Sequence, residues 1–227
     1  MAVYAIADLH LSFGVEKPMD IFKGWENHET RIKNNWERLV KPEDTVVIPG
    51  DISWAMTTAE AEKDFEFIES LPGKKIIMKG NHDLWWQTMK KNSEFIKEKG
   101  FSTISFLHNN AFEVEDKIIC GTRGWIFENN SRRDDKVILR EAGRLKLSLD
   151  SIKSDKEKVV FLHYPPLYQE QKAQHILDIL KEYNIKRVYY GHLHGKTVNY
   201  AFNGEYDGIK YKLISADRLD FCPYIID

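Results

Sequence analysis

The sequence predicts an α/β protein in which two mixed β-sheets pack together and helices cover their outer faces. Two observations support this fold class. The first third alternates short apolar runs with amphipathic segments, in the order strand, helix, strand, helix. Later parts contain short strand-like runs separated by turn residues, which is typical of antiparallel neighbours. No linker-like stretch divides the 227 residues, so we expect one domain over residues 1–227.

Three buried strands are predicted in the first third, at residues 3–7, 45–48 and 75–78. Each is followed by polar residues. In order, these are Asp8-Leu9-His10, Pro49-Gly50-Asp51 and Gly80-Asn81-His82-Asp83. Polar groups at the end of an apolar strand are poorly placed for packing and well placed for a functional site.

Helices are predicted between these strands. Residues 29–39 have helical spacing of their apolar side chains, and Thr57 or Thr58 begins a second helix that ends near Leu71. Proline and glycine in residues 18–25 predict an irregular loop, which we expect to lie over Asp8 and His10.

The second half begins with a short helix at 92–99 and three short strands, which we expect to be antiparallel neighbours, at 103–106, 111–114 and 117–120. Helices at 134–152 and 169–183 then alternate with buried strands at 158–162 and 186–190. These strands end on His163 and on Gly191-His192-Leu193-His194. From Thr197 onward we expect alternating strands with a hairpin turn at Asn203-Gly204.

Composition excludes several classes of protein. Thirty-three basic and thirty-five acidic residues give a net charge of −2, which argues against a duplex nucleic-acid or membrane-surface partner. No stretch approaches the roughly eighteen apolar residues that span a bilayer. Cys120 and Cys222 form no disulfide framework, and Cys120 fits a small core position. We therefore expect a cytoplasmic protein.

Seven side chains of the metal-ligand type follow five predicted strands. Because the carboxyl ends of parallel strands meet at one edge of a sheet, we expect them to converge. They are Asp8, His10, Asp51, Asn81, His163, His192 and His194. Burying two carboxylates and four imidazoles without a cation would be costly.

The donor types narrow the metal. Imidazole with carboxylate and amide oxygen, without thiolate, suits Mn, Fe, Zn, Co or Ni as divalent ions. Seven donors are too many for one tetrahedral zinc ion. They fit two ions that share one bridging carboxylate, and the two ions of such a site lie about 3.5–4 Å apart. Two divalent ions carry more positive charge than the carboxylates of Asp8 and Asp51 neutralise. The site would therefore remain cationic and attract an anionic phosphoester.

This series of motifs, in this order, resembles the calcineurin-like metallophosphoesterase family. The resemblance implies a four-layer αββα sandwich of two mixed β-sheets flanked by helices, with a dinuclear centre. By matching position, the first ion would be held by Asp8, His10, Asp51 and His194. The second would be held by Asp51, Asn81, His163 and His192. His82 would be the general acid and Asp83 would orient it. One position departs from the family, because Trp54 stands where an acidic residue is common.

The predicted activity is metal-dependent hydrolysis of a phosphate ester, by attack of a metal-bound hydroxide at phosphorus while His82 protonates the leaving oxygen. The expected cofactors are two divalent transition-metal ions, with Mn²⁺ favoured in vitro. The substrate would be a small phosphoester or a nucleotide, with a phosphoprotein as a further option. The motifs do not separate phosphomonoesters from phosphodiesters.

Two other functions remain open. One is a pyrophosphate hydrolase acting on a nucleoside conjugate, and the other is a non-catalytic metal-binding scaffold module. The presence of every ligand and of His82 argues against the scaffold.

Arg123 and Trp86 are candidate substrate-binding residues. Arg123 lies in a glycine-flanked loop that suits phosphate contact, or it pairs with Glu128 or a neighbour. Trp86 closely follows a ligand motif and forms either a wall of the site or part of the core. His28, His108 and His175 lie outside every motif and are expected at the surface.

Overall fold

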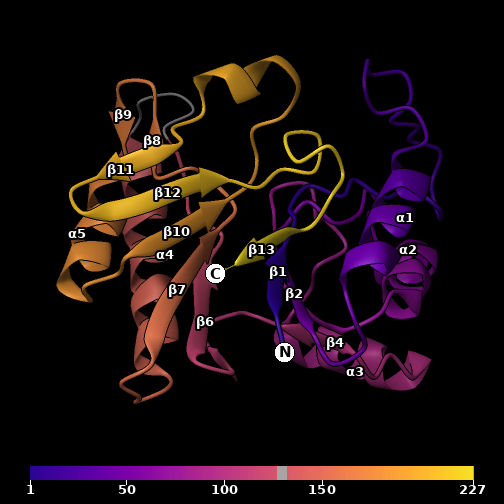
Figure 1. Cartoon of the computed structure of the whole chain (residues 1–227), viewed down its shortest axis with the longest axis horizontal. Helices are drawn as coiled ribbons and strands as arrows, with labels where there is room; N and C mark the ends of the chain where they lie inside the picture. Colours follow the sequence, from indigo (N-terminus) through magenta and orange to yellow (C-terminus); the bar gives the residue numbers. More distant parts are fainter. Residues whose placement is uncertain (127–131, 227) are drawn as a thin grey trace.

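Two large β-sheets lie face to face between two groups of helices in the computed structural model, which describes residues 1–126 and 132–226 (Figure 1). The first sheet has the strand order β13-β1-β2-β3-β4. Its strands are β1 (Val3–Ala5), β2 (Thr45–Ile48), β3 (Lys74–Ile77), β4 (Ile104–Phe106) and β13 (Tyr224–Ile226). Strands β1 to β4 run parallel, and β13 joins β1 antiparallel.

The second sheet has the strand order β11-β12-β10-β7-β6-β5. Its strands are β5 (Phe112–Val114), β6 (Lys117–Thr122), β7 (Glu157–Leu162), β10 (Arg187–Tyr190), β11 (Gly204–Tyr206) and β12 (Ile209–Leu213). The four inner strands are parallel, and both edge strands pair antiparallel. Both sheets are therefore mixed, as predicted.

Helices cover the outer face of each sheet. On the first sheet lie α1 (His28–Leu39), α2 (Thr58–Ser70) and α3 (Met89–Lys99), and on the second lie α4 (Arg132–Asp150) and α5 (Gln174–Glu182) (Figure 1). The four-layer αββα prediction is confirmed. None of the helices in the described part of the chain is long and apolar enough to cross a membrane.

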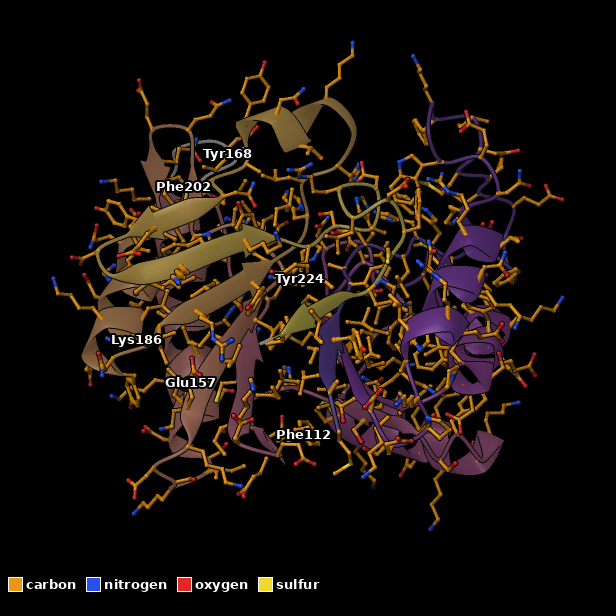
Figure 2. The ribbon with its side chains drawn as sticks, viewed as in Figure 1. Phe112, Glu157, Tyr168, Lys186, Phe202 and Tyr224 are labelled. Carbon is orange, nitrogen blue, oxygen red and sulfur yellow. The ribbon has the colours of Figure 1, made fainter. Side chains whose placement is uncertain are left out.

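The strands alternate between two cores because their side chains point to opposite faces in turn. In β6, Ile119 faces the layer between the sheets, whereas Ile118 and Cys120 pack toward the helices. Phe112 and Tyr224, labelled in Figure 2, pack against the layer between the sheets. Cys120 is buried, as expected, and burial raises the pKa of its thiol to about 12.

Local chemistry sets the helix ends. Thr57 and Glu60 form a reciprocal capping box at the start of α2, as the predicted cap implies. Thr88 caps α3, so this helix begins one turn earlier than predicted, and Gly100 ends it in the left-handed conformation.

Three expectations about pairing and turns are wrong. Of the three strands expected to be antiparallel neighbours, β5 and β6 do pair antiparallel, but β4 does not pair with β5. It runs parallel to β3, because α3 supplies the crossover that a parallel connection needs. The C-terminal hairpin turns at Asp207-Gly208, where both residues have positive φ, and not at Asn203-Gly204. Residues 197–200, where a strand was expected, belong to a 3₁₀ helix at Gly195–Tyr200.

The predicted helix at 169–183 begins only at Gln174. Residues before it form a small antiparallel pair, β8 (Leu167–Tyr168) and β9 (Gln171–Lys172). Gln169 adopts a positive φ in the turn between the two strands, which is incompatible with a continuous helix.

Candidate metal centre

The chain segments that follow β1 and β2 run side by side and carry three of the predicted ligands. Asp8 N donates to Gly50 O at 3.0 Å, and His10 N donates to Asp51 O at 3.0 Å. Asp8, His10 and Asp51 all have positive φ, between 47° and 59°. Non-glycine residues rarely adopt this conformation, and it is concentrated at functional sites, where surrounding structure holds it.

The structure brings these ligands together as two groups that share one carboxylate. Asp8, His10 and Asp51 form the first group, and Asp51, His163 and His192 form the second. In each group, one potential ligand atom from each residue lies within 4.8 Å of the others. Each group could hold a metal ion, and Asp51 belongs to both groups.

Asn81 belongs with the second group. Its Oδ1 lies 2.7 Å from His163 Nε2 and 2.9 Å from His192 Nδ1. The same His163 nitrogen is 3.5 Å from Asp51 Oδ1. These oxygen and nitrogen atoms therefore lie close together, as expected of residues that coordinate the same cation.

His194 is placed less tightly than the other predicted ligands. It belongs to neither of the groups found among the described residues, and its ring stands edge-on to that of His10 with centroids 5.1 Å apart. Burial lowers the pKa of His194, and the nearby Asp217 carboxylate partly opposes this shift. Asp217, which sequence reasoning did not single out, also accepts a hydrogen bond from Gly195 N.

Close packing of two loops requires glycine beside the ligands. A Cβ at Gly80 would overlap Asp51 Oδ1, and one at Gly50 would lie 2.6 Å from Gly80 Cα. Gly50 also has a φ of +97°. A side chain at Gly80 would therefore displace the shared carboxylate, and one at Gly50 would overlap Gly80 and His163 Nδ1.

Burial sets the protonation of the cluster. Desolvation raises the pKa of Asp8 well above its usual range and also raises that of Asp51. It lowers the pKa of His163 to about 3 and of His192 to about 2, and that of His10 falls well below its usual range. These imidazoles are therefore neutral at neutral pH, which is the form that ligates metals.

Unpartnered polar atoms show that the residues fit a cation. Among the described residues, both ring nitrogens of His10 and Asp51 Oδ2 are buried without a hydrogen-bond partner. Such atoms are costly to bury unless something compensates them, and coordination to a divalent ion would do so.

Asp83 has contacts other than those predicted. Its carboxylate accepts five hydrogen bonds and makes none to His82 in the described structure. The donors are Asp51 N, Ile52 N, Ser53 N, Gly80 N and Trp85 Nε1, at 2.7–3.2 Å. Asp83 therefore ties the loop after β2 to the loop after β3. The expectation that it orients His82 has no hydrogen bond to support it, because burial directs the carboxylate inward to these N–H groups.

His82 stands at the rim of the cluster and is partly exposed. Its backbone N donates to Asp51 Oδ1 at 2.8 Å. Its ring lies 4.5 Å from that of Trp54, which also stacks on His10 at 4.8 Å. At the position where the family often has an acid, this chain therefore places an aromatic surface against two histidines.

The predicted loop at 18–25 reaches the cluster through Trp25. This buried ring stands edge-on to His10 at 5.7 Å and to His194 at 6.1 Å. His28 was expected at the surface but is buried, because the start of α1 places its ring 5.4 Å from that of Trp25. Trp25 lies in the loop that was predicted to cover Asp8 and His10, whereas no pattern in the sequence indicated that His28 is buried.

Arg123 and Trp86 line the same cavity of about 340 Å³ beside the cluster. Arg123 O accepts hydrogen bonds from His163 N and Tyr164 N, so the loop is tied to a predicted ligand. The side chain of Arg123 lies 3.9 Å from Glu141, a neighbour that sequence reasoning did not name, and Glu128 lies outside the described residues. Trp86 is 7% exposed and packs edge-on against Phe106, so it serves both the core and the cavity wall.

Comparison with known proteins gives one family. A model of the calcineurin-like phosphoesterases matches residues 1–196. None of the curated proteins matches the chain at a significant level.

Solved structures share the fold. The phosphopantetheinyl hydrolase PptH from Mycobacterium tuberculosis aligns at 14% identity over 99% of this chain and 95% of its own, with a TM-score of 0.59. The protein of unknown function AQ665 from Aquifex aeolicus aligns at 19% identity over 99% and 95%, with a TM-score of 0.54. TT1561 from Thermus thermophilus aligns at 15% identity over 85% and 81%, with a TM-score of 0.55. At these identities the likeness concerns the fold alone.

Proposed function

Since this chain belongs to the calcineurin-like phosphoesterase family and is a hydrolase of phosphoester bonds, we propose that it works with two divalent metal ions that share Asp51. In this proposal Asp8, His10 and His194 complete the site of the first ion. Asn81, His163 and His192 complete the site of the second. When bound, the ions acidify a water molecule and neutralise the phosphoryl oxygens.

The observation that carries the proposal is the sharing of one buried carboxylate by two groups of potential ligands. A single structural metal site would need only one such group. A shared carboxylate holds two sites at a fixed separation, which suits in-line displacement at phosphorus. Asp83 contributes by fixing Asp51 N and Gly80 N, and so the relative position of the two loops.

We assign proton delivery to His82. Its backbone is anchored to Asp51, while its ring remains partly exposed at the rim, where a leaving group would depart. Contact with Trp54 restricts the ring on one side. From this position His82 can give a proton to the leaving oxygen without serving as a ligand.

The test is hydrolysis by purified protein loaded with Mn²⁺. We expect turnover of an aryl phosphomonoester, an aryl phosphodiester or both, and loss of turnover after chelation. The panel should include a nucleoside diphosphate conjugate and a phosphopantetheinylated peptide, because a neighbour of the same fold is a phosphopantetheinyl hydrolase. Metal-loaded protein that is inert toward the whole panel would overturn the proposal and favour a scaffold.

The His82→Ala variant tests the proton assignment separately. We expect it to lose far more turnover on alkyl phosphates than on activated aryl phosphates, because only the alkyl leaving group needs a proton. Its metal content should stay near that of the wild type. Equal losses on both substrates would show that His82 is not the acid.

A further inference from the structure

The cavity beside the metal centre is lined by an excess of positive charge. It lies where the ends of β3 and β6 meet the inner face of α4. Four cationic side chains line it, and among the described lining residues Glu141 is the single carboxylate. The cations are Lys79, Arg123, Arg140 and Arg144. A volume of about 340 Å³ is within the range of small-molecule sites. We call this cavity the basic pocket.

Glu141 organises the arginines of the basic pocket. It is completely buried, and its Oε1 lies 2.7 Å from Arg144 Nη1, with Arg140 and Arg123 at 3.8 Å and 3.9 Å. Its Oε2 accepts a hydrogen bond from Thr122 Oγ1 at 2.7 Å. One carboxylate cannot balance four cations, so the pocket keeps a surplus of positive charge that favours an anionic ligand.

A buried donor in the same pocket has no acceptor. Arg123 Nε is buried without a hydrogen-bond partner among the described residues. A guanidinium presents several N–H donors in a fork that matches phosphate oxygens. This orphaned donor and the charge surplus both indicate that an anion completes the pocket.

The basic pocket adjoins the second group of metal ligands. Arg123 O accepts the hydrogen bond from His163 N, and Lys79 directly precedes Gly80-Asn81. A substrate whose scissile group lies at the metal centre can therefore extend into this pocket.

We propose that the basic pocket binds a second phosphoryl group of the substrate, so that the enzyme favours small molecules carrying two separated phosphoryl groups. This specificity rests on the function proposed above. Trp86 and His108, whose rings are 6.1 Å apart, also line the pocket. They supply an aromatic wall for the part of the molecule that links the two phosphoryl groups.

A binding measurement on metal-free protein tests the pocket without the reaction. The probe is an adenosine that carries one phosphate on its primary and one on a secondary ribose hydroxyl. Arg140→Gln is the preferred variant, because the Arg140 side chain is 56% exposed and its loss carries little risk to folding. Arg144→Gln is a second variant, and Arg38→Gln, on the exposed end of α1, is the matched control.

We expect Arg140→Gln and Arg144→Gln each to weaken calorimetric binding of this adenosine bisphosphate by about tenfold or more, since each removes a charged hydrogen-bond donor. Arg38→Gln should bind as the wild type does. If the three variants bind equally well, or the wild type binds the bisphosphate no better than adenosine, the inference is wrong.

A kinetic measurement separates this inference from the proposed function. With Mn²⁺ bound, wild-type kcat/KM should favour the bisphosphate over both adenosine monophosphates by about tenfold or more, and Arg140→Gln should reduce that preference. Turnover without any preference for the bisphosphate would contradict the inference about the basic pocket but not the proposed hydrolase activity. Arginine-dependent binding with no turnover of any phosphoester would support the pocket and contradict the proposed function.

Discussion

The candidate metal centre and the basic pocket lie side by side but are built in opposite ways. The metal centre takes its side chains from the carboxyl ends of parallel strands, and its backbone holds Asp8, His10 and Asp51 in left-handed conformations. The basic pocket takes two of its arginines from one face of α4 and groups its guanidiniums around Glu141. At a strand end, the backbone conformation fixes the position of a candidate ligand. On α4, the long arginine side chains are held in place by their ion pairs with one carboxylate, Glu141.

This difference predicts different sensitivities. A change in the metal centre should remove metal and turnover together, because its atoms are buried and shared. A change in the basic pocket should alter which substrate is preferred. The following variants test that division, beginning with the largest expected effect.

Asp51→Asn should have the largest effect, because both groups lose their shared carboxylate. We expect turnover of an aryl phosphate to fall by more than about a hundredfold, with loss of bound metal. Elemental analysis and steady-state kinetics measure the two effects. Asp44→Asn is the control, since Asp44 is also buried and accepts backbone N–H hydrogen bonds far along the sheet from the metal centre. Normal metal content in Asp51→Asn would contradict the shared-ligand account.

Asp83→Asn tests whether Asp83 holds the loops after β2 and β3 together or orients His82. The amide would turn one acceptor into a donor facing buried N–H groups, so we expect a loss of about 3–5 kcal/mol in the free energy of unfolding. Denaturant titration measures this loss. Turnover of aryl and alkyl phosphates should fall together. Unchanged stability with a selective loss on alkyl phosphates would instead support orientation of His82.

Asp64→Asn tests a buried acid that connects the chain segments after β1 and β2. Asp64 accepts hydrogen bonds from Phe13 N and from Ser53 Oγ, and burial raises its pKa from 3.8 to about 6. The folded protein therefore retains this proton where the unfolded chain has released it. Its contribution to stability is greatest below about pH 4 and declines as the pH rises to about 6.

We expect the free energy of unfolding of Asp64→Asn, relative to wild type, to rise by up to about 3 kcal/mol between pH 4 and pH 7. Thermal or denaturant unfolding across this range measures the difference. A difference that does not vary with pH would show that burial does not raise the pKa of Asp64 in the folded protein.

Glu141→Gln addresses the basic pocket directly. Without this charge the arginines repel one another, so we expect a loss of about 1–2 kcal/mol in the free energy of unfolding, and a smaller loss at high salt. The exposed Glu66→Gln on α2 should change stability little. An effect of Glu141→Gln that salt does not alter would argue against repulsion among the arginines.

The sequence predicted the convergence of the candidate metal ligands better than it predicted the pocket, for a physical reason. Apolar runs identify buried strands, and a polar side chain directly after such a run lies at the edge of the sheet where that strand ends. Asp51 and His163 are therefore predictable without tertiary information. Arginines on a helix resemble a solvated face, and only the fold shows that Glu141 is buried among them.

The same reasoning explains the other errors. Whether β4 pairs with β3 or β5 depends on where α3 places it, and Asn203-Gly204 competes with Asp207-Gly208 for the same hairpin. The direction of a buried carboxylate depends on donors from distant loops, which is why the contacts of Asp83 were not foreseen. In each case the local signal was present but the outcome depended on long-range packing.

The number of metal ions per chain tests the central claim most directly. Purified wild-type protein, stripped of metal and titrated with Mn²⁺ in a calorimeter, should bind two ions per chain, and elemental analysis after removal of free metal should give the same ratio. The Asp51→Asn variant should bind fewer. Saturation of the wild type at a single ion would contradict a centre built on a shared Asp51.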